Sequence, residues 1–424
     1  MFTISLGRRT PGDASTRRPA PSLARRLTVL LTALLSVLST TLVTTAPPAD
    51  AVYSVQPGPI FNNPFGSYTE KYRGLNHIVA AINHARPGGT IRVATWALNH
   101  QASTDALVNA HRRGVNVRVI VRKSGAHTDQ VKRLTRVLGR DLRRRSYMRF
   151  CYSSCRWHNG AMHSKFVTIT QSGQTRNVVI VSSGNIYTGT AERGFNDVYT
   201  VVGRPRLFDT FTAVFEQMVR DRAVKHPYVV ADAANVRVHF FPRPGTSRAT
   251  DTVYQELEKV RCFGATDGAG QDGRTVIHVS MYNWTDKRGE LLAKKLWELD
   301  DRGCVVKVIF GPRSYEVFQA LKKPTRNGGI EMYDSRLNTN YDGAANKYVH
   351  TKYMLINGYH AGDSSSWTVY TGSHNWTRGA LRTGDEVMLR ITNRGALAAY
   401  RRNFNDVIRI MGLTPTRTAG MPTA

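Results

Sequence analysis

Two short segments of the chain carry the same reactive side chains in the same order. His163–Lys165 is a His-x-Lys tripeptide, followed by an apolar run and the small-residue turn Ser182–Asn185. His350–Lys352 has the same form and precedes the turn Gly372–Asn375. Side chains two apart on a strand point to one face, so each His should share a face with its Lys. Brought together, two imidazoles, two ammonium groups and two amides would hold and attack a phosphate.

These side chains suit phosphodiester cleavage. Negative charge grows on the nonbridging oxygens in the transition state, and fixed donors stabilise it. Histidine can act both as a neutral nucleophile and as a charged acid near neutral pH. We therefore expect His163 and His350 to form the reacting pair. The predicted donors to the phosphoryl oxygens are Lys165, Lys352, Asn185 and Asn375.

Both motifs resemble the signature of the phospholipase D superfamily, His-x-Lys-(x)4-Asp followed by Gly-Ser-x-Asn. The resemblance spans residues 60–412. It implies two halves packed about a pseudo-twofold axis, with one active site at the seam and no metal or other cofactor. It also implies that one His attacks phosphorus to give a phosphohistidine, while the other protonates the leaving alkoxide and then activates water or an alcohol. Either histidine could attack, and family precedent favours His163.

The chain departs from that signature at three positions. The family Asp is replaced by Thr170 and Asn357, and Ser182 stands where Gly is usual. In the family this Asp mostly supports the fold, so every reacting group is retained. The departures predict a divergent branch and leave the substrate open. In the two small-residue turns, Ser183 and Ser373 are predicted to contact the substrate.

Each histidine also needs a partner that fixes its tautomer. Asp197 lies twelve residues beyond Asn185, and Glu386 lies eleven beyond Asn375. Both precede a Val at the start of a predicted strand. Family members carry an acid at this place, so the resemblance assigns the histidine-orienting role to Asp197 and Glu386.

The two halves match well beyond the motifs. Arg92–Trp96 corresponds to His278–Tyr282 as a buried strand, and Val117–Val121 corresponds to Val306–Phe310. The offset is 187 residues between the two histidines and 190 between the two asparagines, which indicates a duplication. Strands alternate with helical segments, so we predict two duplicated phospholipase D-like α/β/α domains with mixed β-sheets. Trp96 and Tyr282, the last residues of the strands Arg92–Trp96 and His278–Tyr282, are expected in the core.

The first 51 residues have the pattern of a secretory signal peptide. Arg25 and Arg26 precede the apolar stretch Leu27–Val43, and Ala49–Ala51 fits the A-x-A cleavage pattern. Serines and threonines dilute the stretch, which disfavours a membrane anchor. We expect cleavage after Ala51 and a secreted, extracellular protein.

The predicted domains are an N-terminal half (residues 52–228), a C-terminal half (residues 229–413) and a flexible tail (residues 414–424). Removing residues 1–51 takes away six Arg and two Asp, which lowers the formal net charge from +29 to +25. Such a charge favours a polyanion or an anionic surface as partner. An arginine-rich stretch, residues 140–149, leads towards His163 and is expected to form an anion-attracting rim.

The four cysteines form an even set, which suits an exported protein. We predict the local disulfides Cys151–Cys155 and Cys262–Cys304. A zinc site would need further ligands at suitable spacing.

The leading hypothesis is a secreted, monomeric phosphodiesterase of phospholipase D type that hydrolyses phospholipid headgroups at an anionic membrane surface or transfers the phosphatidyl group to alcohols. One alternative is a secreted nuclease of the same superfamily that cleaves DNA or RNA. The other is a non-catalytic polyanion-binding protein, which the intact motifs in both halves disfavour.

Overall fold

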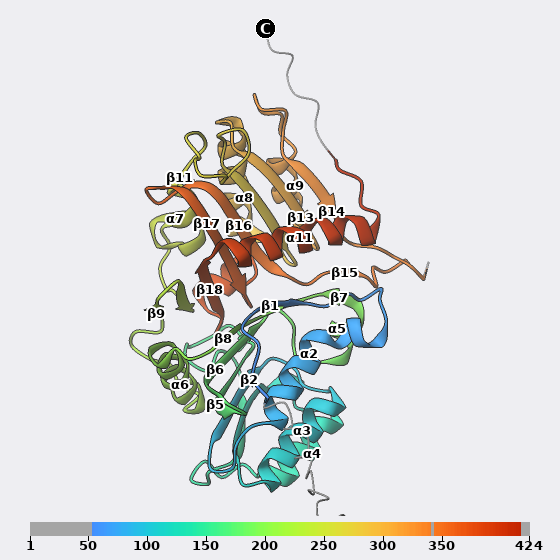
Figure 1. The fold of residues 1–424 in the computed structure, drawn as a ribbon, viewed down its shortest axis with the longest axis vertical. Coiled ribbons are helices and arrows are strands. Elements are labelled where there is room, and N and C mark those ends of the chain that lie inside the picture. The colour runs from blue at the N-terminus through green and yellow to red at the C-terminus, as the bar shows by residue number, and fades with distance from the viewer. Residues whose placement is uncertain (1–52, 341–342, 417–424) are drawn as a thin grey trace, which may run out of the picture. The chain divides into compact units, whose positions relative to one another are not determined.

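The computed structural model describes residues 53–340 and 343–416. The predicted signal peptide and residues 417–424 of the predicted tail lie outside the described residues. The chain has an α/β fold built from two mixed sheets with helices against them (Figure 1). None of the described helices combines the length and the apolar character that a membrane span requires.

The first sheet contains seven strands. Their spatial order is β1 (Gly58–Phe61), β8 (Asp197–Val201), β6 (Thr175–Ser182), β5 (Phe166–Ser172), β2 (Thr90–Thr95), β3 (Asn116–Arg122) and β4 (Tyr147–Cys151). Strands β2, β3 and β4 are parallel, whereas the other pairings are antiparallel. The sheet is therefore mixed, as predicted.

The second sheet repeats this arrangement. Its order is β14 (Glu331–Asp334), β13 (Val305–Phe310), β12 (Val276–Met281), β16 (Lys352–His360), β17 (Asp363–Gly372), β18 (Val387–Thr392), β10 (Val236–Phe240) and β9 (Val229–Ala233). The short β11 (Val260–Arg261) pairs with β16. Strands β12, β13 and β14 are parallel, matching β2, β3 and β4 in the first sheet. The common strand order confirms the duplication.

The helices follow the same repeat. In the first half they are α2 (Tyr68–Asn83), α3 (Gln101–Arg112), α4 (Asp129–Leu138), α5 (Thr188–Arg193) and α6 (Pro205–Val219). In the second half they are α7 (Thr252–Glu258), α8 (Asp286–Asp301), α9 (Tyr315–Leu321), α10 (Arg378–Arg382) and α11 (Arg394–Met411). Short 3₁₀ segments are η1 (Lys123–Gly125) and η2 (Arg248–Thr250). Helices α2, α3 and α4 bury their apolar faces in the outer core of the first half, and α8 and α9 do so in the second.

Local signals explain where the flanking helices begin and end. The Ser67 side chain accepts from the Glu70 backbone N–H, and the Glu70 carboxylate accepts from the Ser67 N–H, which forms a capping box at α2. Asn393 caps α11, and Gly412 ends it with a φ of +60°. That left-handed conformation suits glycine, which has no Cβ to clash.

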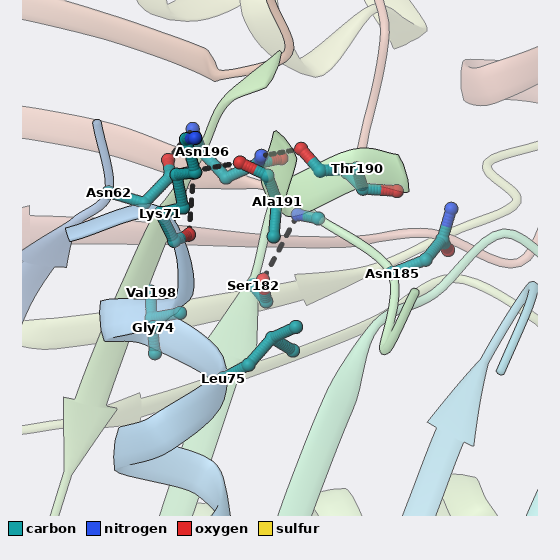
Figure 2. Close-up of a pocket in the computed structure, with 11 residues that line it drawn as sticks. Asn62, Lys71, Gly74, Leu75, Ser182, Asn185, Thr190, Ala191, Asn196 and Val198 are labelled. Carbon is teal, nitrogen blue, oxygen red and sulfur yellow. Dashed lines mark hydrogen bonds between the residues drawn. The ribbon is translucent and has the colours of Figure 1, made fainter. Parts of the chain in front are cut away.

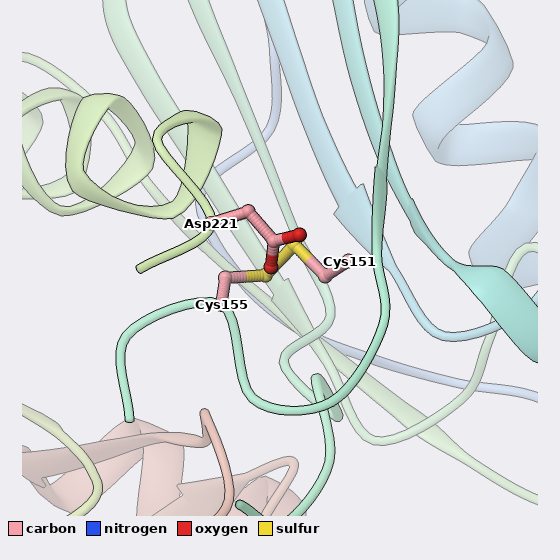
Figure 3. Close-up of side chains that lie close together, drawn as sticks. All are labelled: Cys151, Cys155 and Asp221. Carbon is pink, nitrogen blue, oxygen red and sulfur yellow. A yellow bond between two sulfur atoms is a disulfide. The ribbon is translucent and has the colours of Figure 1, made fainter. Parts of the chain in front are cut away.

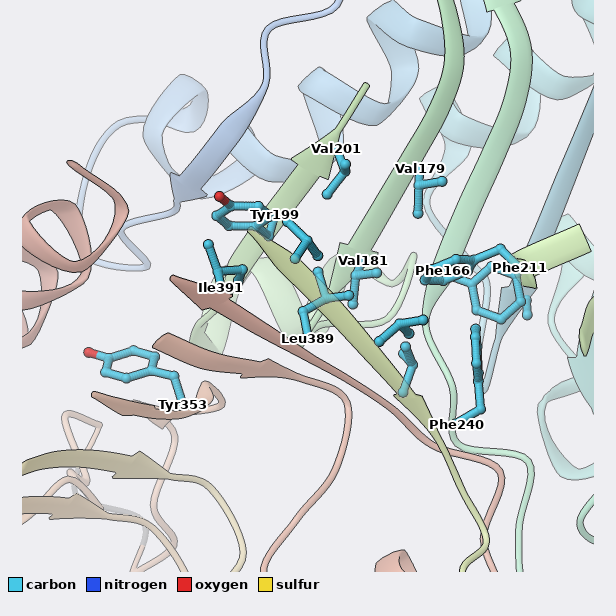
Figure 4. Packing of buried hydrophobic residues seen from close by; sticks show 14 of the residues in the cluster. Phe166, Val179, Val181, Tyr199, Val201, Phe211, Phe240, Tyr353, Leu389 and Ile391 are labelled. Atoms are coloured by element: carbon cyan, nitrogen blue, oxygen red, sulfur yellow. The ribbon is translucent and has the colours of Figure 1, made fainter. Parts of the chain in front are cut away.

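A shared core joins the two halves at their seam. It contains Phe166 and Phe211 from the first half and Phe240, Leu389 and Ile391 from the second (Figure 4). All five side chains are at most 2% exposed. At roughly 1.5–3 kcal/mol for each fully buried large side chain, this core holds the halves together strongly.

Two short backbone pairings cross the seam and bring the motif segments against the opposite half. Strand β15 (Tyr348–Val349) pairs in parallel with β7 (Gly194–Phe195). A parallel bridge joins Met162 to Asp385. The backbone next to each motif histidine is therefore anchored to the other half.

Both predicted disulfides are present. The Cys151–Cys155 bond closes a tight loop beside Asp221 (Figure 3), and the Cys262–Cys304 bond lies in the second half. Asp221 lies 3.6 Å from the Arg149 guanidinium. No described cysteine is left free.

The start of the predicted tail pairs with the second sheet. Thr416 forms an antiparallel bridge with Met332, at the edge of the second sheet. Its backbone exchanges hydrogen bonds of 2.9 and 3.2 Å with Met332, so the described start of the predicted tail is paired with the sheet edge.

Candidate active site

One open cavity of about 480 Å³ gathers most of the predicted catalytic residues from both halves. Among the side chains that line it are His163, Asn185, His350, Asn375 and Glu386. The His-x-Lys segments reach it because each lies at the start of a central strand, β5 or β16. The structure therefore brings the two motifs together in one site.

Glu386 orients His163 across the seam. The Nδ1 of His163 lies 2.8 Å from Oε1 of Glu386, while Oε2 accepts a hydrogen bond from the Ser373 hydroxyl. Burial, then Lys165, Lys352 and Arg122, holds the pKa of His163 well below its usual 6.5. Burial also raises the pKa of Glu386 to about 7. The resting contact is thus a hydrogen bond of a neutral imidazole rather than an ion pair, and it engages Nδ1 rather than Nε2.

His350 has an amide partner instead of an acid. Its Nδ1 lies 2.8 Å from Oδ1 of Asn196. The Asn196 amide nitrogen donates to the carbonyl oxygen of Thr190 at 2.9 Å (Figure 2). It also donates to the carbonyl oxygen of Gly194 at 2.8 Å. Those two acceptors fix the amide orientation, so Oδ1 must face the imidazole and Nδ1 must carry the proton. Asn196 therefore fixes the tautomer of His350, and this contact also engages Nδ1 rather than Nε2.

The prediction that Asp197 orients a histidine is wrong. Asp197 is buried away from the cavity, where Oδ2 accepts hydrogen bonds from Tyr400, at 2.7 Å, and from Thr371. Asn196 and Glu386 each lie eleven residues after the motif Asn, whereas Asp197 corresponds to Val387. Because alternate strand residues face opposite sides, one position decides which side chain reaches the seam.

The two predicted lysines are buried beneath the histidines. Lys165 donates to the His163 carbonyl, and Lys352 donates to the carbonyls of His350 and, at 3.4 Å, Ser183. Burial lowers the pKa of Lys165 to about 7. Burial, followed by the charge of Lys165, also lowers the pKa of Lys352. Because the charge of Lys165 acts on Lys352 in a buried site, a bound anion would stabilise both ammonium groups.

The motif asparagines line the cavity, but the motif serines do not. The side-chain oxygens of Asn185 and Asn375 are buried and have no hydrogen-bond partner among the described residues. Ser183 and Ser373 are fully buried, and their hydroxyls bond within the protein. The prediction that Ser183 and Ser373 contact substrate is wrong, because their side chains point into the sheet. Ser373 instead supports Glu386.

Aromatic side chains flank the histidines, contrary to the expectation that they lie in the core. Trp96 and Tyr282 both line the cavity. The Trp96 ring meets the His163 ring edge to face at 5.0 Å, and the Arg122 guanidinium lies 4.2 Å from the Trp96 ring centroid. Tyr282 lies 4.5 Å from the His350 ring. Trp96 and Tyr282 occupy matching positions in the repeat, and this match is the sequence feature that could have indicated that both flank the histidines.

The predicted basic rim lies at the wrong end of the sheet. Arg143, Arg144 and Arg145 line a separate cavity with His111 and Asn116, at the ends where β3 and β4 begin. The active site lies at the opposite ends of these parallel strands. Strand β4 alone spans five residues, roughly 16 Å at 3.3 Å per residue. Arg122, at the far end of β3, is the arginine of these two strands that approaches the site.

Metal binding has little support in the described ranges. The one group of three potential ligands that meets there is Cys151, Cys155 and Asp221. Its two sulfurs are bonded to each other, so they cannot act as thiolate ligands. The zinc alternative therefore lacks a ligand set at these cysteines.

Comparison with known proteins agrees with the duplicated architecture. A family model described as "Cardiolipin synthase, PLD-like domain" matches residues 78–219 and 272–408. The chain belongs to the phospholipase D superfamily. Members of this superfamily are phosphodiesterases or phosphotransferases. A search of curated protein sequences gives no match.

Solved structures show where this superfamily fold recurs. Phosphatidylserine synthase from Haemophilus influenzae Rd KW20 is 12% identical with a TM-score of 0.55, covering 85% of this chain and 90% of that one. Polyphosphate kinase from Porphyromonas gingivalis is 16% identical with a TM-score of 0.51, covering 84% of this chain; the present chain spans half of that kinase. Nuc from Salmonella typhimurium, a phospholipase D family member, is 17% identical with a TM-score of 0.28, covering 38% and 94%. At these identities the first two similarities show the fold alone.

Proposed function

We propose that this protein is a secreted phospholipase D that hydrolyses phospholipid headgroups through a phosphohistidine, or transfers the phosphatidyl group to alcohols. The observation that carries the proposal is the convergence of two oriented histidines, two buried lysines and two unpartnered asparagine oxygens at one cavity. The chain supplies both motifs, so a monomer suffices. The cationic chain would work at an anionic membrane surface.

In the first step, Nε2 of one histidine attacks phosphorus and the bond to the leaving oxygen breaks. The other imidazolium donates its Nε2 proton to that oxygen, which leaves as a neutral alcohol. Lys165 and Lys352 offset the charge that develops on the nonbridging oxygens. The bound phosphodiester anion also opposes the depression of the histidine pKa values, so a proton accompanies substrate binding.

The unequal partners of the histidines favour His163 as the nucleophile. An imidazole that keeps its Nδ1 proton becomes positively charged when Nε2 binds phosphorus. The Glu386 carboxylate, 2.8 Å from His163, would stabilise that charge throughout the intermediate. His350 faces neutral Asn196, so its imidazolium is the stronger acid and the better proton donor to the leaving group.

In the second step, Nε2 of His350 takes a proton from water or an acceptor alcohol. The resulting oxygen nucleophile attacks phosphorus, and the bond between phosphorus and His163 breaks. This restores neutral His163 and protonated His350. The same geometry therefore serves hydrolysis and transfer, and the choice depends on which acceptor enters the cavity.

A lipid substrate has support from the comparisons. The family model takes its description from cardiolipin synthase, and one structural neighbour is a phosphatidylserine synthase; both names refer to phospholipid chemistry. A secreted nuclease is the second candidate, and the net charge of +25 after signal removal favours it.

The deciding experiment is to incubate the mature protein with phosphatidylcholine vesicles, plasmid DNA and RNA in parallel, all with EDTA present. We expect phosphatidic acid and free choline, with phosphatidylethanol formed when ethanol is added. Cleavage of DNA or RNA without lipid turnover would replace the lipase proposal with the nuclease one. Activity lost in EDTA and restored by zinc or magnesium would contradict the metal-free mechanism.

A further inference from the structure

A second cavity lies beside the catalytic one and is rich in cations. Its volume is about 240 Å³, several times the roughly 30 Å³ that one water occupies in the liquid. Five cationic side chains line it, against one acid, Asp251. The cations are Arg248, Lys287, Arg288, Arg378 and Arg382.

Helix α10 separates this basic cavity from the catalytic cavity. Gly379 and Ala380 line the catalytic side, whereas Arg378 and Arg382 line the basic side. Buried Arg288 links the two, because it donates to the carbonyl oxygen of Asn375 at 3.0 Å. A group held in the basic cavity would therefore sit one short helix away from the reacting phosphate.

The nearby acids do not balance this positive charge. Asp286 accepts hydrogen bonds from the backbone N–H groups of Arg288 and Arg378, at 2.9 and 2.8 Å, and forms no ion pair with their guanidinium groups. Asp251 is already paired with buried Arg288, at 2.7 Å. Lys287 pairs with Glu290. Arg378 forms no ion pair within 4 Å among residues 53–340 and 343–416, and its side chain is exposed. At least one guanidinium is thus available to an incoming anion.

Arg382 is held in place by the neighbouring turn rather than by an acid. It donates to the carbonyl oxygens of Arg243, Ser247 and Thr250 and to the Thr250 hydroxyl, at 2.8–3.3 Å. Burial lowers its pKa, Asp251 acts against this shift, and the charges of Arg288, Arg243 and Arg378 lower the pKa further. Like charges crowded into a partly buried cavity repel one another, and a bound anion relieves that repulsion.

We propose that this basic cavity binds the phosphate of an anionic phospholipid beside the scissile headgroup. The proposal rests on the proposed function for the identity of the ligand, and it adds a preference for anionic interfaces. A planar guanidinium suits a phosphate, because it can donate two parallel hydrogen bonds. The second lipid would tether the enzyme with α10 at the interface while its neighbour reacts.

The test variant is Arg378→Ala, because Arg382 and Arg288 also hold the fold. The matched control is Arg144→Ala, an exposed arginine beyond the far end of the first sheet. Initial rates are measured on phosphatidylcholine vesicles with and without phosphatidylglycerol. We expect Arg378→Ala to lose about fivefold in the activation by phosphatidylglycerol, the scale of one surface cation near an anionic membrane. Turnover of a soluble short-chain phosphatidylcholine should stay unchanged.

A second measurement does not depend on turnover. Calorimetric titration with sn-glycerol 3-phosphate should find two classes of site in the wild type. Arg378→Ala should weaken one class about tenfold, since a charge-assisted hydrogen bond contributes on that scale. His163→Ala should alter the other class alone. If no phospholipid is turned over, the proposed function fails, yet this titration still decides the anion site.

Several results would overturn the inference. One is a single class of glycerol 3-phosphate sites, or equal behaviour of Arg378→Ala and Arg144→Ala in both assays. Another is an Arg378→Ala loss confined to the binding of short oligonucleotides, which would assign the cavity to a nucleic-acid backbone. A third is an equal loss on the soluble substrate, which would place Arg378 in the catalytic site.

Discussion

Asn196 and Glu386 occupy equivalent positions in the two halves, and each contacts the motif histidine of the opposite half. The contact distance is 2.8 Å in both cases. One histidine thus faces a carboxylate and the other a neutral amide. This difference breaks the symmetry of the duplicated site, and two of the predictions below depend on it.

The two histidine roles can be separated with a labelled substrate. With a phospholipid, His163→Ala and His350→Ala should each lose several orders of magnitude in kcat, because the two groups act as a unit. With a p-nitrophenyl phosphodiester, whose leaving group needs no proton, His350→Ala should accumulate phosphohistidine and His163→Ala should not. Acid-quench labelling and peptide mapping would detect it. Label on position 350 in His163→Ala would reverse the assignment.

Removal of the Glu386 charge should slow chemistry more than binding. Glu386→Gln keeps an oxygen for His163 and a group for Ser373 but loses the charge that stabilises the phosphoimidazolium. We expect kcat to fall about hundredfold, the scale of one well-placed electrostatic group, with KM nearly unchanged. Steady-state kinetics on short-chain phosphatidylcholine would measure this. Unchanged kcat would show that Glu386 has only a packing role.

Anion affinity should depend on pH through Lys165. Burial lowers the pKa of this lysine to about 7, so the ammonium group loses its proton as pH rises through that value. We expect the affinity for sulfate, whose own charge is constant in this range, to fall between pH 6 and pH 8, by about tenfold per lost charge. Calorimetric titration at several pH values would measure it, with Lys165→Met as the control that should lose most of the dependence. A flat profile in the wild type would contradict the lowered pKa.

Buried histidines should make the fold sensitive to acid. Burial lowers the pKa of His278 to about 3, whereas the unfolded chain titrates near 6.5. Between these values the unfolded state binds more protons, so stability falls as the pH is lowered. For His278 the loss is about 2 kcal/mol at pH 5. Urea unfolding at pH 7 and pH 5 would measure it.

The control for this prediction is His278→Phe, which keeps an aromatic ring against Phe404. The variant should lose less stability than the wild type between the two pH values. Equal losses in the two proteins would assign the acid sensitivity to other groups, such as His239, whose pKa burial lowers to about 4.

The sequence predicted those features that depend on local pattern and repetition. The mixed α/β architecture, both disulfides and the pairing of the two His-x-Lys motifs all follow from short-range spacing or from the offset between halves. The expectation for Asp197 fails because it rests on the acidic side chain, whereas the offset of 190 residues between the motif asparagines leads from Glu386 to Asn196. The register of a residue, and not its chemical type, determines which face of a strand its side chain occupies.

Other misplacements arose where contacts are distant in sequence. The arginines at 143–145 precede His163 closely along the chain, yet a whole strand separates them in space. Trp96 ends a buried strand and for that reason was expected in the core, but the opposite half of the chain leaves room for the cavity beside it. The first arrangement depends on the strand that lies between the arginines and the motif, and the second depends on how the two sheets meet.

The unequal partners of His163 and His350 have a consequence for how such a site can specialise. In a symmetric homodimer of a single half, one residue position would orient both histidines, and any substitution there would alter both of them at once. A single polypeptide holding both halves encodes the two positions separately. Covalent linkage therefore permits one imidazole to be adapted to bonding with phosphorus and the other to carrying a proton. Identical subunits cannot separate the two roles in this way.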